Sequence, residues 1–556
     1  MTLTPEHLLS AAVTSGLIDA EAADDLQSAA RRQGADLLDL VTTHGRFPVA
    51  ALYRALAAVK NLPFVDLEGA ACPHDLVRRV PESLMVRQMV LPIAQEHDGV
   101  RVATAHPDDG QTIETLRRVL GQPIHLAVAD PESLLSTIRR ALAEARPGVA
   151  GVVPGPAAVP IDAIAALDRL LKEAFLRRAS DIHLEPQEDR LRVRLRVDGR
   201  LREYPAGLGP EEGSSLVSRV KVLAGLDIAE QRAPQDGGFS HALPGAQGVS
   251  IDVRVATSPT RWGERVTLRL LGLETEELTL EGLGMSPADL QRFRAVIRRP
   301  YGMILLTGPT GSGKTTTLYA ALREINRPDR NILTVENPIE YVIPGISQVQ
   351  VGGGEKVTFA SALRSLLRHD PDILMVGEIR DRETADVAIK AAMTGHLVFS
   401  TLHTNSACAA VARLQDLGCE PYLISSTLIA VVAQRLVRRL CPWCKRARRA
   451  AEAELAWLGG EGDLSAIGIA PPVPAVVEVC EPVGCAHCLG TGFRGRIGLF
   501  ESLWIDRDLS QRIGRGATQV DLETAVAGRM TRLREEGIAK VLARVTSFDD
   551  VIAATV

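Results

Sequence analysis

A glycine-rich segment at residues 308–315 has the residue types and spacing that hold nucleotide phosphates. It reads Gly-Pro-Thr-Gly-Ser-Gly-Lys-Thr and fits the pattern G-x-x-x-x-G-K-[ST]. Its glycines let backbone N–H groups converge on phosphate oxygens, and the helix expected after it adds positive potential. We expect Lys314 to pair with the β- and γ-phosphates of ATP and the Thr315 hydroxyl to bind Mg²⁺. The predicted nucleotide-binding residues are Gly308, Pro309, Thr310, Gly311, Ser312, Gly313, Lys314, Thr315 and Thr316.

Two carboxylates follow short apolar segments that we predict to be buried strands. Glu378 comes two residues after the segment 373–376, and Glu336 comes directly after the segment 332–335. A carboxylate at a strand tip beside a phosphate loop can face the metal or its water, although an ordinary buried strand end has the same pattern. Most phosphate-loop enzymes place Asp one position earlier, where this chain has Gly377. From the residues alone, both explanations of Glu378 stay open, while Glu336 supplies a third strand end with a carboxylate able to polarise an attacking water.

Two histidines, His396 and His403, flank the predicted apolar strand at residues 397–402. This spacing excludes a pair of ligands at positions i and i+4 of one helix, so a zinc-protease site is ruled out. Histidines at strand ends are commonly polar side chains with satisfied hydrogen bonds. In an ATPase sheet, they could instead sense the γ-phosphate.

Two Cys-x-x-Cys pairs, Cys441 with Cys444 and Cys485 with Cys488, are separated by 40 residues. Four thiolates in two such pairs suit a tetrahedral Zn²⁺ with no open position, which predicts a structural metal. The first pair could instead be a redox pair, but no thioredoxin-like βαβ pattern surrounds it. Cys480 is near enough to be a rival ligand, although it has no partner at this spacing.

Arginines alternate with apolar residues in a stretch that we predict to be a strand. Four guanidiniums therefore share one face of it. The same alternation returns at residues 265–270. A solvated outer face is the ordinary explanation, and a surface that meets an anion is the more specific one. The four arginines are Arg190, Arg192, Arg194 and Arg196.

The elements that position these residues belong to several domains. At about 150 residues per domain, 556 residues predict roughly three to four. The balance of 63 Lys+Arg against 68 Asp+Glu lacks the basic excess of a dedicated nucleic-acid binder. The N-terminal segment shows no signal peptide, which predicts reduced thiols. The apolar stretch 423–437 is interrupted by polar residues and is shorter than the ~18 residues of a spanning helix, so we expect any membrane association to be peripheral or through a partner.

We predict a mostly helical domain at residues 1–145, a Pro/Gly-rich linker at 146–160, a second domain at 161–272 and a third at 280–556. The third region alternates short apolar strands with helices, which is typical of an α/β fold with a mainly parallel sheet.

Residues from about 160 to 556 closely resemble the assembly ATPases of type II secretion and type IV pili. The nearest likeness is to the ATPases of the general, type II, secretion pathway. The resemblance rests on a series of motifs in the family's order: Ala179-Ser-Asp-Ile-His-Leu-Glu-Pro186, Leu226–Glu230, Pro234–Gly237, Gly308–Leu318, Thr334–Glu340, Leu363–Asp372, Gly377–Asp381, Thr394–Asn405 and Gly484–Arg496.

This resemblance implies a RecA-like phosphate-loop ATPase domain. An α+β, PAS-like domain and a helical partner-docking domain precede it, and residues 438–497 form a small zinc subdomain. It implies that Glu336 is the general base, that Glu378 is the Walker B glutamate and that His396 and His403 form a histidine box. ATP, Mg²⁺ and Zn²⁺ are the implied cofactors.

The resemblance also implies a cytoplasmic homo-hexamer. The ring would dock at the inner membrane on a bitopic docking protein and a polytopic platform protein. Because family members work as rings, we hypothesise that Arg196, Arg254 and Arg269 reach nucleotide phosphate as the ring closes. Some relatives bind cyclic di-GMP through positions that here are Ala35-Asp36-Leu37 and Lys60, so we do not expect this ligand to bind.

Three rival functions remain. The first is the extension motor of type IV pili, within the same family. The second is a nucleic-acid motor, which the acidic composition and the lack of a basic track with aromatic residues disfavour. The third is a nucleotide-gated scaffold that does not hydrolyse ATP, against which Lys314, Thr315, Glu336 and Glu378 together argue.

Overall fold

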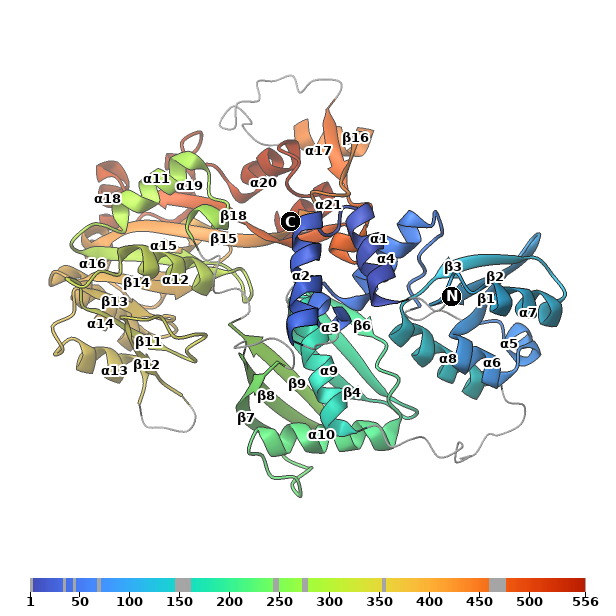
Figure 1. Ribbon diagram of the computed structural model, residues 1–556. Helices are drawn as coiled ribbons and strands as arrows, with labels where there is room; N and C mark the ends of the chain where they lie inside the picture. Colours follow the sequence, from blue (N-terminus) through green and yellow to red (C-terminus); the bar gives the residue numbers. More distant parts are fainter. Residues whose placement is uncertain are drawn as a thin grey trace. The chain divides into compact units, whose positions relative to one another are not determined.

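The computed structural model describes residues 4–33, 37–43, 47–67, 72–145, 162–243, 250–272, 279–352, 357–459 and 477–555 (Figure 1). The predicted linker at 146–160 and two of the residues weighed for cyclic di-GMP, Ala35 and Asp36, lie outside this part of the chain. One compact unit lies within residues 1–273, and a second lies within residues 274–483 and 492–556. The short segment 484–491 is described below with the cysteine site.

The first half of the first unit combines helices with a three-stranded sheet. Thr4 caps α1 by accepting the N–H of His7, and Pro5 supplies a helical φ at the first position. Strand β2 pairs antiparallel with β1 and parallel with β3. The elements are α1 (Pro5–Thr14), α2 (Ala20–Gln33), α3 (Leu37–Thr43), α4 (Val49–Val59), α5 (His74–Arg79), α6 (Glu82–Gln88), β1 (Val90–Glu96), β2 (Gly99–Thr104), α7 (Gly110–Leu120), β3 (Ile124–Val128) and α8 (Pro131–Ala145).

The second half of the first unit is an antiparallel sheet with the strand order β6-β5-β4-β9-β8-β7. Alternate residues of its strands pack with two helices in one core, which leaves the arginines of β5 on the other face. The elements are α9 (Ala163–Leu176), β4 (Ala179–Pro186), β5 (Leu191–Val197), β6 (Arg200–Tyr204), α10 (Pro210–Leu223), β7 (Gln235–Ala242), β8 (Ser250–Thr260) and β9 (Gly263–Leu271).

The second unit is built on a seven-stranded sheet with the order β12-β11-β13-β14-β10-β15-β18. Its strands are parallel except for β18, which runs antiparallel to β15. Met303 and Leu305 of β10 enter one core, while Ile304 and Leu306 enter another. Helices therefore cover both faces, as expected for a parallel sheet, and the predicted α/β fold class is confirmed.

The elements of the second unit's sheet region are η2 (Glu281–Leu283), α11 (Pro287–Val296), β10 (Gly302–Thr307), α12 (Lys314–Ile325), β11 (Ile332–Glu336), β12 (Ser347–Gln350), α13 (Phe359–Leu366), β13 (Ile373–Val376), α14 (Arg382–Met393), β14 (Leu397–Leu402), α15 (Ala407–Asp416), α16 (Pro421–Thr427) and β15 (Leu428–Leu440). The remaining elements are β16 (Arg446–Arg449), α17 (Glu452–Gly459), β17 (Glu478–Glu481), η4 (Ala486–Cys488), β18 (Phe493–Trp504), α18 (Arg507–Gly514), α19 (Gln519–Ala525), α20 (Leu533–Leu542) and α21 (Phe548–Thr555).

The apolar stretch at 423–437 is divided between α16 and the central strand β15. Across the described ranges, every helix is too short or too polar to cross a membrane.

Candidate nucleotide-binding and metal sites

The phosphate loop lies between β10 and α12, as its sequence predicts. Gly308 has a φ of +148°, and a Cβ atom there would come 2.5 Å from the carbonyl oxygen of Gln434. Gly313, with a φ of +87°, precedes the first turn of α12, where a Cβ atom would come 2.8 Å from Nε2 of Gln434. Both positions therefore need glycine. Ser312 is buried, and within the described residues its Oγ has no hydrogen-bond partner.

Lys314 lies buried along the inside of the loop. Its Nζ donates to the carbonyl oxygens of Gly308 and Pro309 at 2.8 and 3.1 Å. Burial, and to a smaller extent the nearby charge of Arg435, lower the pKa of Lys314 to about 8 against the opposing effect of Glu378. Among the described residues, the ammonium thus donates to neutral carbonyl oxygens, which a phosphate oxygen can replace.

Glu378 lies just past the carboxyl end of β13, two strands from β10 in the sheet order. Its carboxylate contacts Arg380 at 2.5 Å and Nε2 of His403 at 3.2 Å. A Cβ atom on Gly377 would come 3.3 Å from the carbonyl oxygen of Val335. A side chain at position 377 would therefore need the neighbouring strand to move by a few tenths of an ångström.

Glu336 ends β11 and is almost fully buried. Its Oε1 accepts from Oγ1 of Thr334 at 2.7 Å and from Nε2 of Gln348 at 3.0 Å, while the Tyr319 hydroxyl donates to Oε2. Burial and the bond to Glu336 raise the pKa of Tyr319 well above its ordinary value, so the phenol stays protonated and donates. Because Tyr319 belongs to α12, the helix that begins at the phosphate loop also orients Glu336.

His396 and His403 lie at opposite ends of β14 and therefore at opposite edges of the sheet. His403 is at the carboxyl edge with Glu378. His396 is at the other edge, where its Nδ1 lies 2.9 Å from the carbonyl oxygen of Ala391 and its own carbonyl accepts the N–H of Gly302. A six-residue strand separates the two by about 20 Å. His403 therefore lies at the same edge of the sheet as the phosphate loop, and His396 lies at the opposite edge.

The arginine face of the first unit is matched by carboxylates. Glu203 contacts Arg190 at 3.4 Å and Arg192 at 3.0 Å, and Glu185 contacts Arg194 at 2.6 Å. These pairs account for three of the four alternating arginines, Arg190 just before β5 and Arg192 and Arg194 within it, without an external anion. For those three, the ordinary explanation of a solvated, ion-paired face is sufficient.

The other predicted arginines form one row across four strands. Asp181 on β4 lies opposite Arg196 of β5 and opposite Arg269 of β9, and Arg269 lies opposite Arg254 of β8. Asp181 contacts Arg269 at 3.0 Å and Arg196 at 3.6 Å. The structure thus brings together the three arginines that the sequence analysis selected, with a single carboxylate in the register positions between them.

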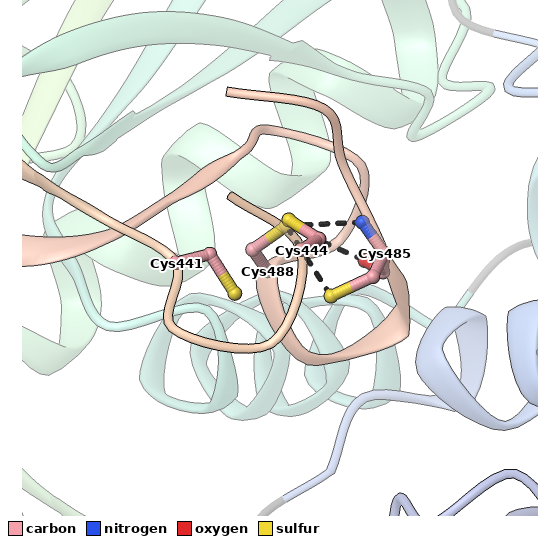
Figure 2. A group of neighbouring side chains, drawn as sticks. All are labelled: Cys441, Cys444, Cys485 and Cys488. Carbon is pink, nitrogen blue, oxygen red and sulfur yellow. Dashed lines mark hydrogen bonds between the residues drawn. The ribbon is translucent and has the colours of Figure 1, made fainter. Parts of the chain in front are cut away.

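The four predicted zinc ligands converge on one point (Figure 2). The Sγ atoms of Cys441, Cys444, Cys485 and Cys488 all lie within 4.8 Å of one another. The two in the second pair are 3.8 Å apart, which is about the spacing of sulfurs around a tetrahedral Zn²⁺ with bonds of about 2.3 Å. Cys480 is buried with Leu440 and Phe493 and is not part of this group.

Comparison with known proteins agrees with this architecture. Residues 160–553 match the family described as Type II/IV secretion system protein. The type II secretion system protein E of Aeromonas hydrophila is 47% identical over 417 residues, which are 75% of this chain and 79% of that one. The chain belongs to the type II/IV secretion system protein family. Residues 61–148 also match the MshEN domain.

Two further relatives and one solved structure extend the comparison. The type II secretion system ATPase E of Vibrio cholerae is 47% identical over 394 residues, covering 70% of this chain and 75% of that protein. The type IV pilus assembly ATPase PilB of Myxococcus xanthus is 35% identical, with 98% of each chain covered. The ATPase DotB of Yersinia pseudotuberculosis, 20% identical, superposes with a TM-score of 0.53 over 74% of this chain and 99% of that one, which shows the shared fold.

Four polar residues of this secretion-family chain contact the predicted site but were missed by sequence reasoning. Tyr319 and Gln348 hold Glu336, and Gln434 and Arg435 lie against the phosphate loop. None of them belongs to a spacing pattern of known chemistry. Because α12 begins at residue 314, helical periodicity could have placed Tyr319 on the sheet side of that helix, but not beside a particular carboxylate.

Proposed function

We propose that this secretion ATPase is the motor of a type II secretion system. It hydrolyses ATP to ADP and phosphate, and the reaction powers pseudopilus assembly and protein export at the inner membrane. One observation carries the proposal: Lys314, Glu378 and Glu336 all lie at the carboxyl edge of one parallel sheet, the edge at which such folds bind ligands. The 47% identity to type II secretion proteins supports the choice of system.

The residues of the loop fit ATP and Mg²⁺. The buried Ser312 Oγ is available to a phosphate oxygen, and α12 directs its N-terminus at the loop. Lys314 exchanges the carbonyls of Gly308 and Pro309 for the β- and γ-phosphates. Thr315, which is exposed, and Glu378 hold Mg²⁺ and its water.

Glu336 acts on the attacking water as the general base. Gln348, Thr334 and Tyr319 fix both carboxylate oxygens, which leaves one lone pair on Oε2 to accept a proton. A rigidly held carboxylate orients the water as well as deprotonating it. His403 contacts Glu378, so a shift of either side chain when nucleotide binds is passed to the other.

The site is completed in a homo-hexameric ring. Asp181 contacts both Arg269 and Arg196, so its single negative charge is shared between two guanidiniums, and the register places Arg254 next in the same row. A phosphate is a suitable ligand for such a row of guanidiniums. We assign the three arginines to the nucleotide at a subunit interface. An isolated subunit then binds ATP and hydrolyses it slowly.

The four cysteines hold one structural Zn²⁺. The thiolates fill all four tetrahedral positions, so this metal stabilises its subdomain and has no open position for substrate. The helical N-terminal domain docks on the cytoplasmic part of a membrane partner, and a polytopic platform protein receives the mechanical work. The ATPase is then peripheral to the inner membrane from the cytoplasmic side.

Type IV pilus assembly is the second candidate. The Myxococcus xanthus pilus ATPase aligns with this chain from end to end, whereas the type II relatives cited above align over 70–75% of it. Deletion of the gene in its host separates the two candidates. Loss of exported enzymes with normal surface pili supports type II secretion, and loss of pili with normal export supports the pilus motor.

Steady-state hydrolysis by the purified protein tests the enzymatic part. Phosphate release should require Mg²⁺ and should be lost in Lys314→Ala, which lacks the loop cation. A wild-type ring that binds ATP without turnover would instead support the nucleotide-gated scaffold.

A further inference from the structure

Strand β15 continues beyond the last residue of β10 with which it pairs, and there it lies against the start of the phosphate loop. β15 runs parallel to β10, and their last register pair joins Thr307 to Ala433. The next two residues of β15, Gln434 and Arg435, therefore lie beside the loop. A Cβ atom on Gly308 would come 3.2 Å from Nη1 of Arg435, which places the guanidinium in contact with the first residue of the loop.

The guanidinium of Arg435 donates hydrogen bonds to neutral oxygens. Nη1 donates to the carbonyl of Gln434 at 3.1 Å, and Nη2 donates to the carbonyl and to Oδ1 of Asn405 at 3.3 and 3.2 Å. Burial lowers the pKa of Arg435, so its surroundings disfavour its charge, and Glu501 opposes that shift. Arg435 in turn disfavours the charge of Lys314. An anion between these two cations relieves both penalties.

The loop that holds Arg435 is the one that carries His403. The hydroxyl of Thr404 lies 2.7 Å from that of Thr307, at the end of β10, and the Thr404 N–H donates to the same oxygen. Asn405 follows directly and binds Arg435. A continuous chain of contacts therefore runs from Glu378 through His403 and this loop to the guanidinium beside the phosphate loop.

We propose that Arg435 is a further nucleotide-binding residue, whose guanidinium contacts the phosphate tail of a nucleoside di- or triphosphate held by the phosphate loop of the same chain. The inference rests on the proposed ATP site and adds a residue to it. A guanidinium suits this position because its planar fork can keep one N–H on Asn405 while another binds a phosphate oxygen. It differs from the interfacial arginines because it acts within one subunit.

Equilibrium binding of a fluorescent ADP analogue to the full-length protein tests this, with inorganic pyrophosphate as the competitor. Arg435→Gln should weaken both ligands about ten- to hundredfold, the cost of one charge-assisted hydrogen bond. Arg435→Lys, which keeps the charge, should recover part of the affinity. The matched control is Arg439→Gln, an exposed arginine on the same strand, which should bind like the wild type.

The outcomes separate this inference from the proposed function. Wild-type affinity in Arg435→Gln, or equal losses in Arg435→Gln and Arg439→Gln, overturns the role of Arg435 while ATP hydrolysis by the wild type still stands. A loss for the ADP analogue without a matching loss for pyrophosphate also overturns it, because the contact is then not with phosphate. If Arg435→Gln is poorly folded by circular dichroism, the folded Arg435→Lys decides: unchanged affinity for both ligands refutes the need for a guanidinium. Failure of the wild type to bind nucleotide contradicts the proposed function itself.

Discussion

The cysteine site and the phosphate loop differ in how many of their binding groups already have partners within the chain. The four cysteine sulfurs lie together, and as thiolates they would complete a tetrahedral Zn²⁺ without a further ligand. The phosphate loop keeps spare bonding capacity: the Oγ of Ser312 is buried without a partner in the described chain, and Lys314 and Arg435 contact neutral oxygens. A closed set stabilises the fold, whereas spare donors mark a place where a ligand comes and goes. Substitutions at the two sites should therefore fail in different ways.

The largest effect on turnover is expected from the arginine row. Arg254→Ala and Arg269→Ala should lower the rate about 10³- to 10⁵-fold, which is the range for an arginine supplied to a phosphoryl transfer. Nucleotide affinity of the isolated subunit should stay unchanged. The measurement is turnover against protein concentration, which should rise as rings assemble in the wild type. Arg192→Ala, which removes an ion-paired neighbour on the same face, serves as the control. Full activity in a monomeric sample would return the whole row to the solvated-face explanation.

A smaller loss is expected at the carboxylate that Tyr319 orients. Glu336→Gln should bind ATP normally and turn over about 10²- to 10⁴-fold more slowly, because an amide cannot accept the proton of water. Single-turnover rates beside equilibrium affinities separate the two properties. Normal hydrolysis by this variant would show that another group is the base.

The pH dependence of binding should reflect the open state of the loop. Lys314 has a pKa of about 8 before ligand arrives, and only the charged ammonium pairs with phosphate. Affinity for ADP should therefore be flat below pH 8 and weaken by up to about tenfold per pH unit above it, since binding must then take up a proton. Titration of affinity between pH 6.5 and 9.5 measures the break. In Lys314→Met, the residual affinity should lose this dependence.

Substitution in the closed site should hardly change turnover per folded molecule. Cys485→Ser should release zinc and lower the melting temperature, because metal binding contributes folding free energy to such subdomains. Cys480→Ser is the matched control, a buried thiol outside the group, and should keep its zinc. Metal analysis with thermal unfolding decides. If the purified wild type contained no zinc and were nevertheless fully stable, the cysteine site would not be a structural metal site, and its contrast with the phosphate loop would be lost.

Sequence reasoning succeeded where chemistry depends on residues that are adjacent in the chain. The loop 308–315, with its strand before and helix after, is one contiguous pattern, and the spacing of each cysteine pair is local as well. The row of Arg196, Arg269 and Arg254 could be selected, but Asp181 between them depends on the register of four strands, which no single segment encodes. Arg435 was missed for the same reason, because its contact with Gly308 spans more than a hundred residues.

The sequence pattern was sufficient to predict the edge of the sheet at which His396 lies, but the prediction did not use it. A six-residue strand between two histidines places them at opposite edges of any sheet, so one of them had to lie away from the loop. The family resemblance groups the two in one motif, and that grouping by sequence obscured the geometry. The domain limits and the absence of cyclic di-GMP binding stay predictions.

Strand β15 has a consequence for how force travels in this unit. It contacts the phosphate loop at Arg435, runs on to Leu440 and ends directly before Cys441, about 20 Å further along. Between Arg435 and Leu440 the ladder to β18 holds one side of β15, and we expect a shift of Arg435 on ATP hydrolysis to pass along this paired strand. We expect the half-exposed indole of Trp443, three residues beyond Leu440, to report such a shift as a change in its intrinsic fluorescence.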